Sequence, residues 1–266
     1  MTTTADLADL KGRTIFITGA GQGVGRQVAL HAAAHGAGAV VINDYFMDRA
    51  ESVAAEIEAL GVRAVAVQAD VSDFDSVGAA FATAREAVGP ISILVNNAGN
   101  AGPNGQAAGP ATPYWAQGPK DWSAYLSVNL YGVLNSTRHA LEDMVAAGYG
   151  RVITVISDAG RVGEPGLEVY SGAKAAAAGF MRGIARSVGR YNVTANSVAL
   201  AATRTPFVEA IMQDEEMLKA QLKRYIIRRF GEPDDAANMI IFLASDAAGW
   251  ITAQTIPVNG GYSVSQ

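Results

Sequence analysis

The sequence of 266 residues contains no cysteine. This absence excludes disulfide bonds, thiolate metal sites and a cysteine nucleophile, and it is compatible with a reducing cytosol. Histidine is scarce as well: His31, His35 and His139 have no carboxylate or histidine partner at ligand spacing, so the sequence predicts no metal site.

Long apolar runs are also missing, since none reaches the roughly 18 residues that a membrane span needs. The N-terminus, MTTTADLADLKGR, carries acids where a signal peptide needs positive charge. Twenty-five acidic residues outnumber 20 lysines and arginines, which gives a net charge of −5 and no global basic surface for nucleic acid. We therefore expect a soluble, cytoplasmic protein with neither a membrane nor a nucleic-acid partner.

A glycine-rich turn follows the first predicted strand. The strand covers residues 13–18, and the sequence GAGQGVG at residues 19–25 leads from it into a helical pattern. Glycine allows backbone N–H groups at the start of such a helix to approach a pyrophosphate, because a Cβ atom would block the way. The same residues also fit an ordinary turn, but their position directly after the first strand favours a dinucleotide site.

An acid stands at the end of the second predicted strand. Residues 39–43 lead to Asp44, which lies about 20 residues past the glycines, where a ribose-binding carboxylate belongs. Such a carboxylate accepts both ribose hydroxyls of NAD and repels the 2′-phosphate of NADP. Gln22 favours NAD too, because no base stands in the glycine turn. A solvated acid is the alternative, and Arg49 leaves room for NADP.

Strands and helices alternate along the whole chain. Further strands are expected at residues 63–68, 91–95 and 151–156, and each ends in small polar residues or glycine. Half of the residues are hydrophobic, which suits one large α/β domain or two small ones. The alternation predicts an α/β fold with a parallel sheet and a ligand at its carboxyl edge.

Tyr170 and Lys174 lie four residues apart in a helix predicted to begin near Val169. On a helix this spacing places them on one face, one turn apart, although an exposed pair would show the same spacing. An ammonium beside a phenol stabilises its anion, so we predict that the pKa of Tyr170 is lowered from about 10 toward a range useful for proton transfer. Ser157 ends the preceding strand, and its hydroxyl can reach a group held against the tyrosine.

Six motifs in chain order resemble the short-chain dehydrogenase/reductase family. They are TGAGQGVG (residues 18–25), Asp70, NNAG (residues 96–99), Asn129, Ser157 and YSGAK (residues 170–174). The match runs from the first strand to the terminal VNGG at residues 258–261. The resemblance implies a Rossmann-type, doubly wound, mainly parallel seven-stranded sheet with helices on both faces, in a single domain over residues 1–266. It also implies a substrate lid at about residues 203–228.

The resemblance further implies roles for particular residues. Ser157 would donate a hydrogen bond to the substrate oxygen, Tyr170 would give or take the proton, and Lys174 would stabilise the tyrosinate and bond the nicotinamide ribose. Asn129 would hold a water connecting Lys174 to solvent, although alone it also fits a capping or packing amide. The cofactor-binding set would be Gly19, Gln22, Gly23, Val24, Gly25, Asp44, Asp70, Val71, Asn97, Ala98, Gly99, Tyr170, Lys174, Thr203 and Thr205.

Two departures from the family stand beside the expected substrate mouth. Residues 100–120 are longer than the usual connection, and Tyr114 and Trp115 are candidates there for an apolar substrate wall, with surface packing as the alternative. The Pro-Gly that normally follows the sixth strand is replaced in ALAATRT (residues 199–205). The loss of that glycine leaves the nicotinamide contacts less defined, although Thr205 matches the residue that holds the carboxamide.

The predicted lid carries an apolar stripe and a basic cluster. An apolar stripe suits either a ligand or packing of the lid on the domain, and consists of Ile211, Met212, Met217, Leu218 and Leu222. A basic cluster holds five of the chain's 20 bases within eleven residues: Lys219, Lys223, Arg224, Arg228 and Arg229. The cluster fits the phosphates of a coenzyme A or carrier-protein thioester, or else a solvated helix face. Arg229 also matches a structural arginine of the family.

Three functions remain open at this point. The first is an NAD(H)-dependent ketoreductase or alcohol dehydrogenase for a fairly apolar small molecule, with NADP(H) not excluded. The second is a 3-oxoacyl or hydroxyacyl thioester reductase or dehydrogenase, favoured by the basic cluster and by SDAGRVG after the strand that ends at Ser157. The third, a non-catalytic cofactor sensor, is disfavoured by the intact Ser157, Tyr170 and Lys174. By resemblance, the helices expected at residues 121–147 and 169–190 form a dimer interface within a homotetramer.

Overall fold

One parallel sheet organises the protein. The computed structural model describes residues 7–100, 112–204 and 215–264, and its seven strands lie in the order β3-β2-β1-β4-β5-β6-β7. The strands are β1 (Thr14–Thr18), β2 (Ala39–Asp44), β3 (Arg63–Gln68), β4 (Ile93–Asn96), β5 (Gly150–Ser157), β6 (Val193–Leu200) and β7 (Thr255–Val258). The α-helices are α1 (Gly23–Ala34), α2 (Met47–Ala59), α3 (Phe74–Val88), α4 (Pro119–Leu126), α5 (Gly132–Ala147), α6 (Ala159–Val162), α7 (Glu168–Val188), α9 (Glu215–Leu222) and α10 (Pro233–Ala244). The predicted Rossmann-type single domain is confirmed.

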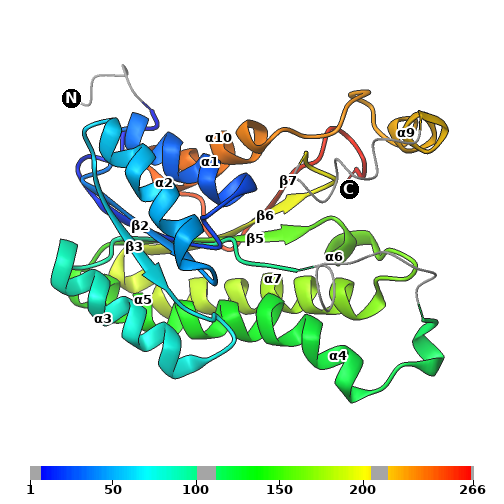
Figure 1. The fold of residues 1–266 in the computed structure, drawn as a ribbon, viewed down its shortest axis with the longest axis horizontal. Coiled ribbons are helices and arrows are strands. Elements are labelled where there is room, and N and C mark those ends of the chain that lie inside the picture. The colour runs from blue at the N-terminus through cyan, green and yellow to red at the C-terminus, as the bar shows by residue number, and fades with distance from the viewer. Residues whose placement is uncertain (1–6, 101–111, 205–214, 265–266) are drawn as a thin grey trace.

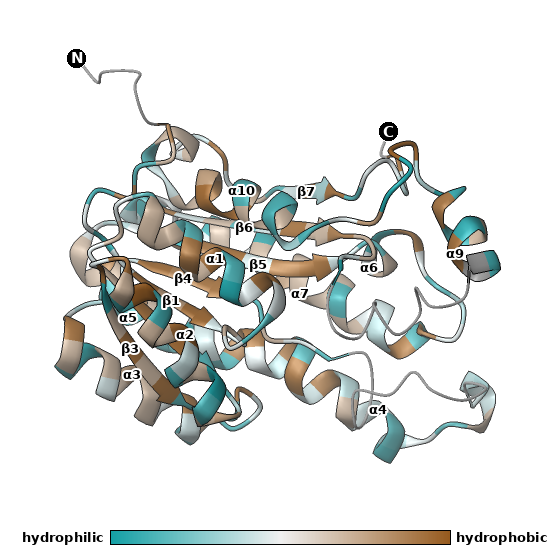
Figure 2. Ribbon diagram, turned by 45° about the horizontal axis from the view of Figure 1, so that its top comes forward, coloured by the Kyte–Doolittle hydropathy of each residue, from teal (hydrophilic) through white to brown (hydrophobic). Residues whose placement is uncertain are grey.

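Helices cover both faces of the sheet, which explains why its strands are continuously apolar. Figure 1 shows α1, α2 and α10 on one side and α3, α5 and α7 on the other. Successive side chains of a strand point to opposite faces, so Ile15 and Ile17 join the first core and Phe16 joins the second. Phe16 stacks on Phe81 of α3 with ring centroids 4.1 Å apart. The hydrophobic strands between the helices are visible in Figure 2.

The order of the strands changes direction between β1 and β4. The chain runs outward from β1 through β2 to β3 and then returns to pair β4 with β1, with Phe16 opposite Leu94. Parallel sheets of this kind bind ligands outside the carboxyl ends of the strands at such a reversal. In Figure 1 the arrowheads of β5 and β6 point toward the end of the molecule that carries α6 and α9.

Two local elements differ from the sequence expectation. The single helix expected at residues 121–147 is divided into α4 and α5 by a π-helical turn, Ser127–Tyr131. The side chain of Asn129 in this turn donates to the carbonyl of Tyr125, four residues back, which is the acceptor that an α-helix would use for its own backbone. The loop expected after β5 instead begins with α6, a single helical turn.

Residues 205–214 fall outside the described part of the chain, and with them Thr205, Ile211 and Met212 of the predicted site and lid. Among the residues that are described, no helix combines the length and the apolar character that crossing a bilayer would require.

Candidate active site

The carboxyl ends of β1 and β4 are tied together by side-chain hydrogen bonds. The Thr18 hydroxyl accepts the backbone N–H groups of Asn97 and Ala98, each at 3.0 Å. The amide of Asn97 donates to the Gly19 carbonyl at 2.9 Å. Gly19 has φ +61°, and a Cβ atom there would lie only 2.8 Å from Cα of Ala98. The predicted residues Gly19, Asn97 and Ala98 thus share one wall, with glycine required by both backbone angle and space.

The N-terminus of α1 faces the same edge and fits the phosphates of a dinucleotide. Its capping residue Gln22 makes no side-chain cap hydrogen bond, and no acid stands in the first turn of the helix. The orphan N–H groups and the positive end of the helix dipole therefore remain suited to an anion. A Cβ atom at Gly25 would lie 2.4 Å from the Gly19 carbonyl oxygen, so glycine is needed for the close turn.

Asp44 ends β2 beside this turn. One oxygen of its buried carboxylate accepts the N–H of Gly21 at 2.9 Å, and the other accepts the N–H of Phe46 at 3.1 Å. The carboxylate is therefore fixed next to the predicted phosphate turn, as the ribose-binding role requires. Arg49 is also close, because a Cβ atom at Gly21 would lie 2.6 Å from Cβ of Arg49, and its guanidinium stacks 4.4 Å from the ring centre of Phe46.

The turn after β3 is held by Asp70. Its carboxylate accepts the backbone N–H of Ser72 at 2.9 Å and the Ser72 hydroxyl at 2.7 Å. Val71 is buried against Gly132, where a Cβ atom would lie 2.8 Å from a Val71 methyl. The carbonyl of Val71 accepts the Asn135 amide at 2.9 Å. These contacts hold the predicted cofactor-binding residue Val71 against α5.

Lys174, Asn129 and Gly99 meet at the end of β4. A Cβ atom at Gly99 would lie 3.0 Å from Oδ1 of Asn129 and 3.1 Å from Nζ of Lys174. Lys174 is 4% exposed, and its ammonium donates to the Val155 carbonyl of β5 at 3.1 Å. Asn129 is fully buried and donates to the Asn100 carbonyl at 2.9 Å. The structure thus brings together three predicted residues that lie far apart in the sequence.

The predicted lowering of the Tyr170 pKa is wrong for this structure. Burial raises the pKa of Tyr170 above its usual 10, and the hydrogen bond with Ser157 opposes the rise only in part. Burial also lowers the pKa of Lys174 to about 8. The two groups do share a helix face, with the Lys174 ammonium 5.8 Å from the Tyr170 ring centre. Desolvation disfavours the charged form of each group, which explains both directions.

Three further residues that the sequence singled out lie in connecting segments: Thr203 follows β6, and Tyr114 and Trp115 precede α4. Thr203 bonds the Ala201 carbonyl at 3.2 Å, and the buried Tyr225 accepts the N–H of Ala202 at 3.2 Å. Tyr225 supports the segment that lacks the usual Pro-Gly, a role that its sequence position did not reveal. Trp115 is 87% exposed, and Tyr114 stacks on Trp122 at 6.0 Å. The described contacts therefore favour surface packing over an apolar substrate wall.

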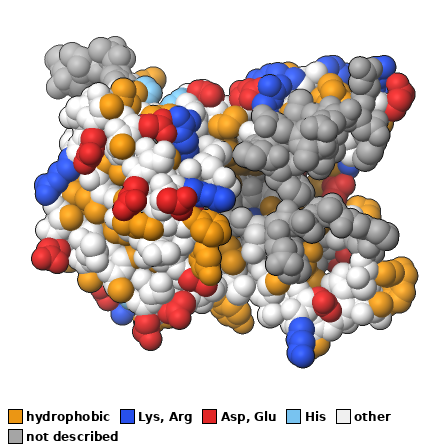
Figure 3. All heavy atoms as spheres, viewed as in Figure 1, with side chains coloured by type: hydrophobic (Ala, Val, Ile, Leu, Met, Phe, Trp, Pro, Cys, Tyr) orange, Lys and Arg blue, Asp and Glu red, His pale blue; other side chains and the backbone are white. Residues whose placement is uncertain are grey.

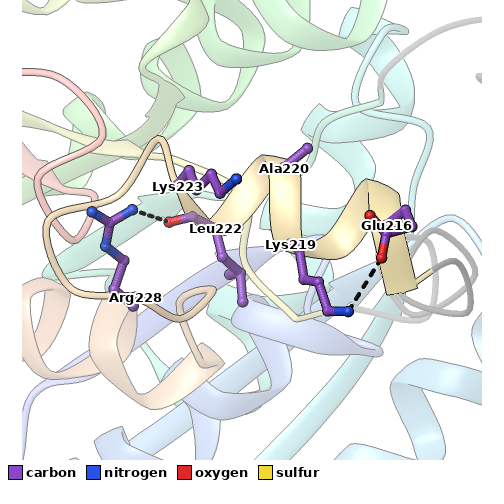
Figure 4. A pocket seen from close by; sticks show the side chains of 6 residues that line it. All are labelled: Glu216, Lys219, Ala220, Leu222, Lys223 and Arg228. Carbon is purple, nitrogen blue, oxygen red and sulfur yellow. Dashed lines mark hydrogen bonds and ion pairs between the residues drawn. The ribbon is translucent and has the colours of Figure 1, made fainter.

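Neighbouring acids pair with three of the five bases in the basic cluster of the predicted lid. The ion pairs are Arg224 with Glu164 at 3.2 Å, Arg229 with Asp235 at 2.6 Å, and Lys219 with Glu216 at 3.2 Å. Figure 4 shows a cavity at α9 in which Lys219 points to Glu216 and Arg228 points to the Leu222 carbonyl. Basic and acidic side chains also stand side by side over this end of the molecule in Figure 3. The cluster offers less net charge to a phosphate than its sequence indicates.

Sequence reasoning missed Thr18, Asn100 and Tyr225 as organisers of this edge. Thr18 is the first residue of the glycine motif and Asn100 directly follows NNAG, so their positions in the motifs could have indicated both residues. Their partners, however, come from other strands or helices. Only the folded chain shows that Thr18 bonds two backbone groups after β4 and that Asn100 bonds Asn129.

Comparison with known proteins agrees with this geometry. A family model described as enoyl-(acyl carrier protein) reductase matches residues 19–263. The 3-oxoacyl-[acyl-carrier-protein] reductase FabG of Staphylococcus aureus is 34% identical over 249 residues, covering 94% of this chain and 97% of FabG. A gluconate 5-dehydrogenase from Burkholderia cenocepacia, solved with NADP and tartrate, has a TM-score of 0.89 and 32% identity, covering 97% of this chain and 99% of that one.

A 7α-hydroxysteroid dehydrogenase solved with NADH and 7-oxo glycochenodeoxycholic acid has a TM-score of 0.89 and 31% identity, and 98% of each chain is covered. These relatives differ in substrate, but all are named as reductases or dehydrogenases, and the two solved structures contain NADP or NADH. The chain therefore belongs to the short-chain dehydrogenase/reductase family and is an oxidoreductase of that family.

Proposed function

We propose that this protein is an NAD(H)-dependent oxidoreductase that interconverts the carbonyl and secondary alcohol of a fairly apolar small molecule. The observation that carries the proposal is the convergence of Lys174 and Asn129 beside Gly99, with the Tyr170 ring next to the Lys174 ammonium, at the sheet edge where Asp44 also ends its strand. When bound, the nicotinamide supplies the site that gives or accepts a hydride. The residues of the chain then have to bind and orient the cofactor and the substrate, and to protonate the substrate oxygen.

Ser157 and Tyr170 handle the substrate oxygen in this proposal. The Ser157 hydroxyl is near enough to the Tyr170 phenol to counter part of the rise in its pKa, so an oxygen placed against one is within reach of the other. Because burial raises the pKa of Tyr170, its phenol is protonated at neutral pH, which is the form that donates a proton to a carbonyl in the reductive direction. The Lys174 ammonium lies over the Tyr170 ring and binds the nicotinamide ribose. Asn129 holds a water that connects Lys174 to solvent.

The preference for NAD(H) rests on Asp44. Its carboxylate is fixed beside the glycine turn by two backbone N–H groups, and a 2′-phosphate there would face a like charge. Arg49 stands close enough to offset part of that repulsion, so NADP(H) binding is weakened rather than abolished. Relatives of similar fold bind either cofactor, NADP in the gluconate 5-dehydrogenase and NADH in the hydroxysteroid dehydrogenase.

Substitution Tyr170→Phe tests the proposal. It removes the proton donor while keeping the ring, and we expect turnover to fall by roughly 10² to 10⁴ because a general acid is typically worth that much. NADH binding, measured by calorimetric titration, should stay close to that of the wild type. Tyr191→Phe removes a hydroxyl at the opposite edge of the sheet and serves as the matched control. Activity retained in Tyr170→Phe would refute the assignment.

A thioester substrate is the second candidate, and the similarity to FabG favours it. The paired state of the basic cluster argues against phosphate binding there. Charge reversal at Arg224 would break its ion pair with Glu164, so Lys223→Glu is the cleaner test. A higher KM for an acyl-CoA, with an unchanged KM for a bare ketone, would support the thioester. A panel of ketones and acyl thioesters with NADH and NADPH compares both candidates directly.

A non-catalytic sensor has no support from the relatives, which are named as reductases and dehydrogenases. We further propose that residues 203–228 act as the substrate lid and that four copies assemble as in the family. The exposed small residues of α7, such as Gly172 and Ala176, allow close packing against another copy.

A further inference from the structure

Asp158 is a buried carboxylate directly after Ser157. Its side chain is enclosed where β5 ends, and the residue is 1% exposed. It accepts hydrogen bonds from Arg161 at 2.6 Å, from the Asn259 amide at 2.6 Å and from the Ser263 hydroxyl at 3.0 Å. A buried carboxylate is costly unless it is paired and hydrogen-bonded, and this one satisfies both conditions.

Two of these partners come from the far end of the chain. Asn259 and Ser263 belong to the turn after β7, whereas Arg161 lies on α6. Arg161 also donates to the Ser263 hydroxyl at 2.8 Å, and the Asn259 amide donates to the Ser263 carbonyl at 2.9 Å. The carboxylate of Asp158 therefore closes the C-terminal turn onto the start of α6.

The start of α6 in turn controls Ser157. The backbone N–H of Ala159, the first residue of α6, donates to the Ser157 hydroxyl oxygen at 3.2 Å. Asp158 continues the sheet, because its N–H donates to the Leu200 carbonyl at 2.9 Å. Because Ala159 occupies one lone pair, the direction of the Ser157 hydroxyl, toward Tyr170 and a substrate oxygen, depends on the position of α6. Movement of α6 would turn this hydroxyl.

We infer that Asp158 is a positioning residue, which holds α6 with the C-terminal turn and thereby aims the Ser157 hydroxyl at the substrate oxygen. The inference rests on the proposed function, because it assumes that Ser157 binds the substrate. It predicts that residues 259–263, although remote in sequence, are needed for turnover rather than only for stability.

The test compares Asp158→Asn with Asp246→Asn in the full-length protein. Asp246 is a matched control because its carboxylate also binds several groups, Lys11, Arg13 and Tyr149, but at the opposite edge of the sheet. We expect Asp158→Asn to lower kcat by roughly tenfold or more, since small displacements of reacting groups cost that much. The coenzyme KM should change by less than about twofold, because Asp158 touches none of the predicted cofactor groups. Asp246→Asn should lower Tm and leave kcat unchanged.

Amide hydrogen exchange of residues 157–163 provides a readout that does not depend on activity. Exchange should become faster in Asp158→Asn and stay unchanged in Asp246→Asn. The double variant Asp158→Asn with Asn259→Asp swaps donor and acceptor in the hydrogen bond between these two side chains. It should therefore recover part of the lost kcat and slow the amide hydrogen exchange again. Ser263→Ala, at the rim of the cluster, should act in the same direction as Asp158→Asn and covers the case in which that variant does not fold.

Equal losses of Tm in the two Asn variants, with kcat and exchange at residues 157–163 unaffected, would overturn the inference and leave Asp158 a structural residue. A double exchange that performs no better than Asp158→Asn would count against it too. Failure of the proposed function would appear differently, as absence of nicotinamide-dependent turnover in the wild type, while the exchange measurement would still report on Asp158.

Discussion

At the scale of single residues, burial shifts the pKa values of the two candidate catalytic groups on α7. Lys174 is almost fully enclosed, and removal of water lowers its pKa to about 8 from the ordinary 10.5. Tyr170 responds to the same desolvation in the opposite direction, with a raised pKa. The sequence spacing of the two residues correctly predicted that they share a helix face, but it carried no information on how deeply either is buried.

Lys174→Met tests this cost of burial. A lowered lysine pKa means that the folded protein binds fewer protons than the unfolded chain between pH 8 and 10.5, so this residue makes stability rise with pH across that window. Below pH 8 the full penalty is present, at most roughly 3 kcal/mol, since each pKa unit is worth about 1.4 kcal/mol. We expect Lys174→Met to have the higher Tm at pH 7 and to lose this advantage toward pH 10 in calorimetric scans. A constant difference in Tm would contradict the burial argument.

Asp44→Asn tests the coenzyme preference. The amide keeps the size of the side chain and removes the charge that opposes a 2′-phosphate. We expect the NADPH to NADH ratio of kcat/KM to rise by about tenfold or more, equivalent to about 1.4 kcal/mol. Glu51→Gln removes an exposed acid from α2 and should leave the ratio unchanged. An unchanged ratio in Asp44→Asn would assign coenzyme choice to other residues.

At the scale of elements, glycines allow three segments to meet within hydrogen-bond distance. Gly19 admits the segment after β4, and Gly99 admits the side chains of Asn129 and Lys174. The π-helical turn adds its own contribution, because it aims the Asn129 amide at both the Tyr125 and Asn100 carbonyls, each at 2.9 Å. π-helical turns often occur at functional sites, which agrees with this placement.

Gly99→Ala should therefore disturb the candidate site more than the fold. A Cβ atom there would stand 3.0 Å from Asn129 and 3.1 Å from Lys174, so both side chains must shift by a few tenths of an ångström. We expect kcat to fall by about tenfold or more, because positioning errors of this size are costly in catalysis. Gly189→Ala, where a Cβ atom meets nothing within 4 Å, should leave kcat unchanged. Equal kcat values in the two variants would show that Asn129 and Lys174 can shift away from residue 99 without loss of activity.

At the scale of the whole molecule, one face of α7 packs on the sheet and the other exposes small side chains. Buried Ala173, Ala177 and Met181 form the inner face. Gly172, Ala176 and Gly183 are exposed on the outer face. Small residues let two helices approach closely, which is the basis for the proposed assembly.

Ala176→Arg tests that assembly. A long charged side chain at this exposed position would separate two α7 helices but costs a free helix little. We expect light scattering with size-exclusion chromatography to show a smaller particle than the wild type, while far-UV circular dichroism stays the same. Ala79→Arg places the same change on an exposed position of α3 and should not alter the mass. An unchanged mass in Ala176→Arg would remove α7 from the interface.

The sequence by itself determined the alternation of strands and helices in an α/β fold, because local periodicity and glycine turns reveal that alternation. The candidate residues at the carboxyl edge came from the resemblance of the motifs to a known family. Only the tertiary structure decided which groups touch. The burial that raises the pKa of Tyr170, the ion pair of Arg224 with Glu164, and the hydrogen bond of Asn259 to Asp158 all depend on segments distant in the chain. Such contacts depend on which elements pack against each other, and the local periodicity of a sequence does not show which distant elements will meet.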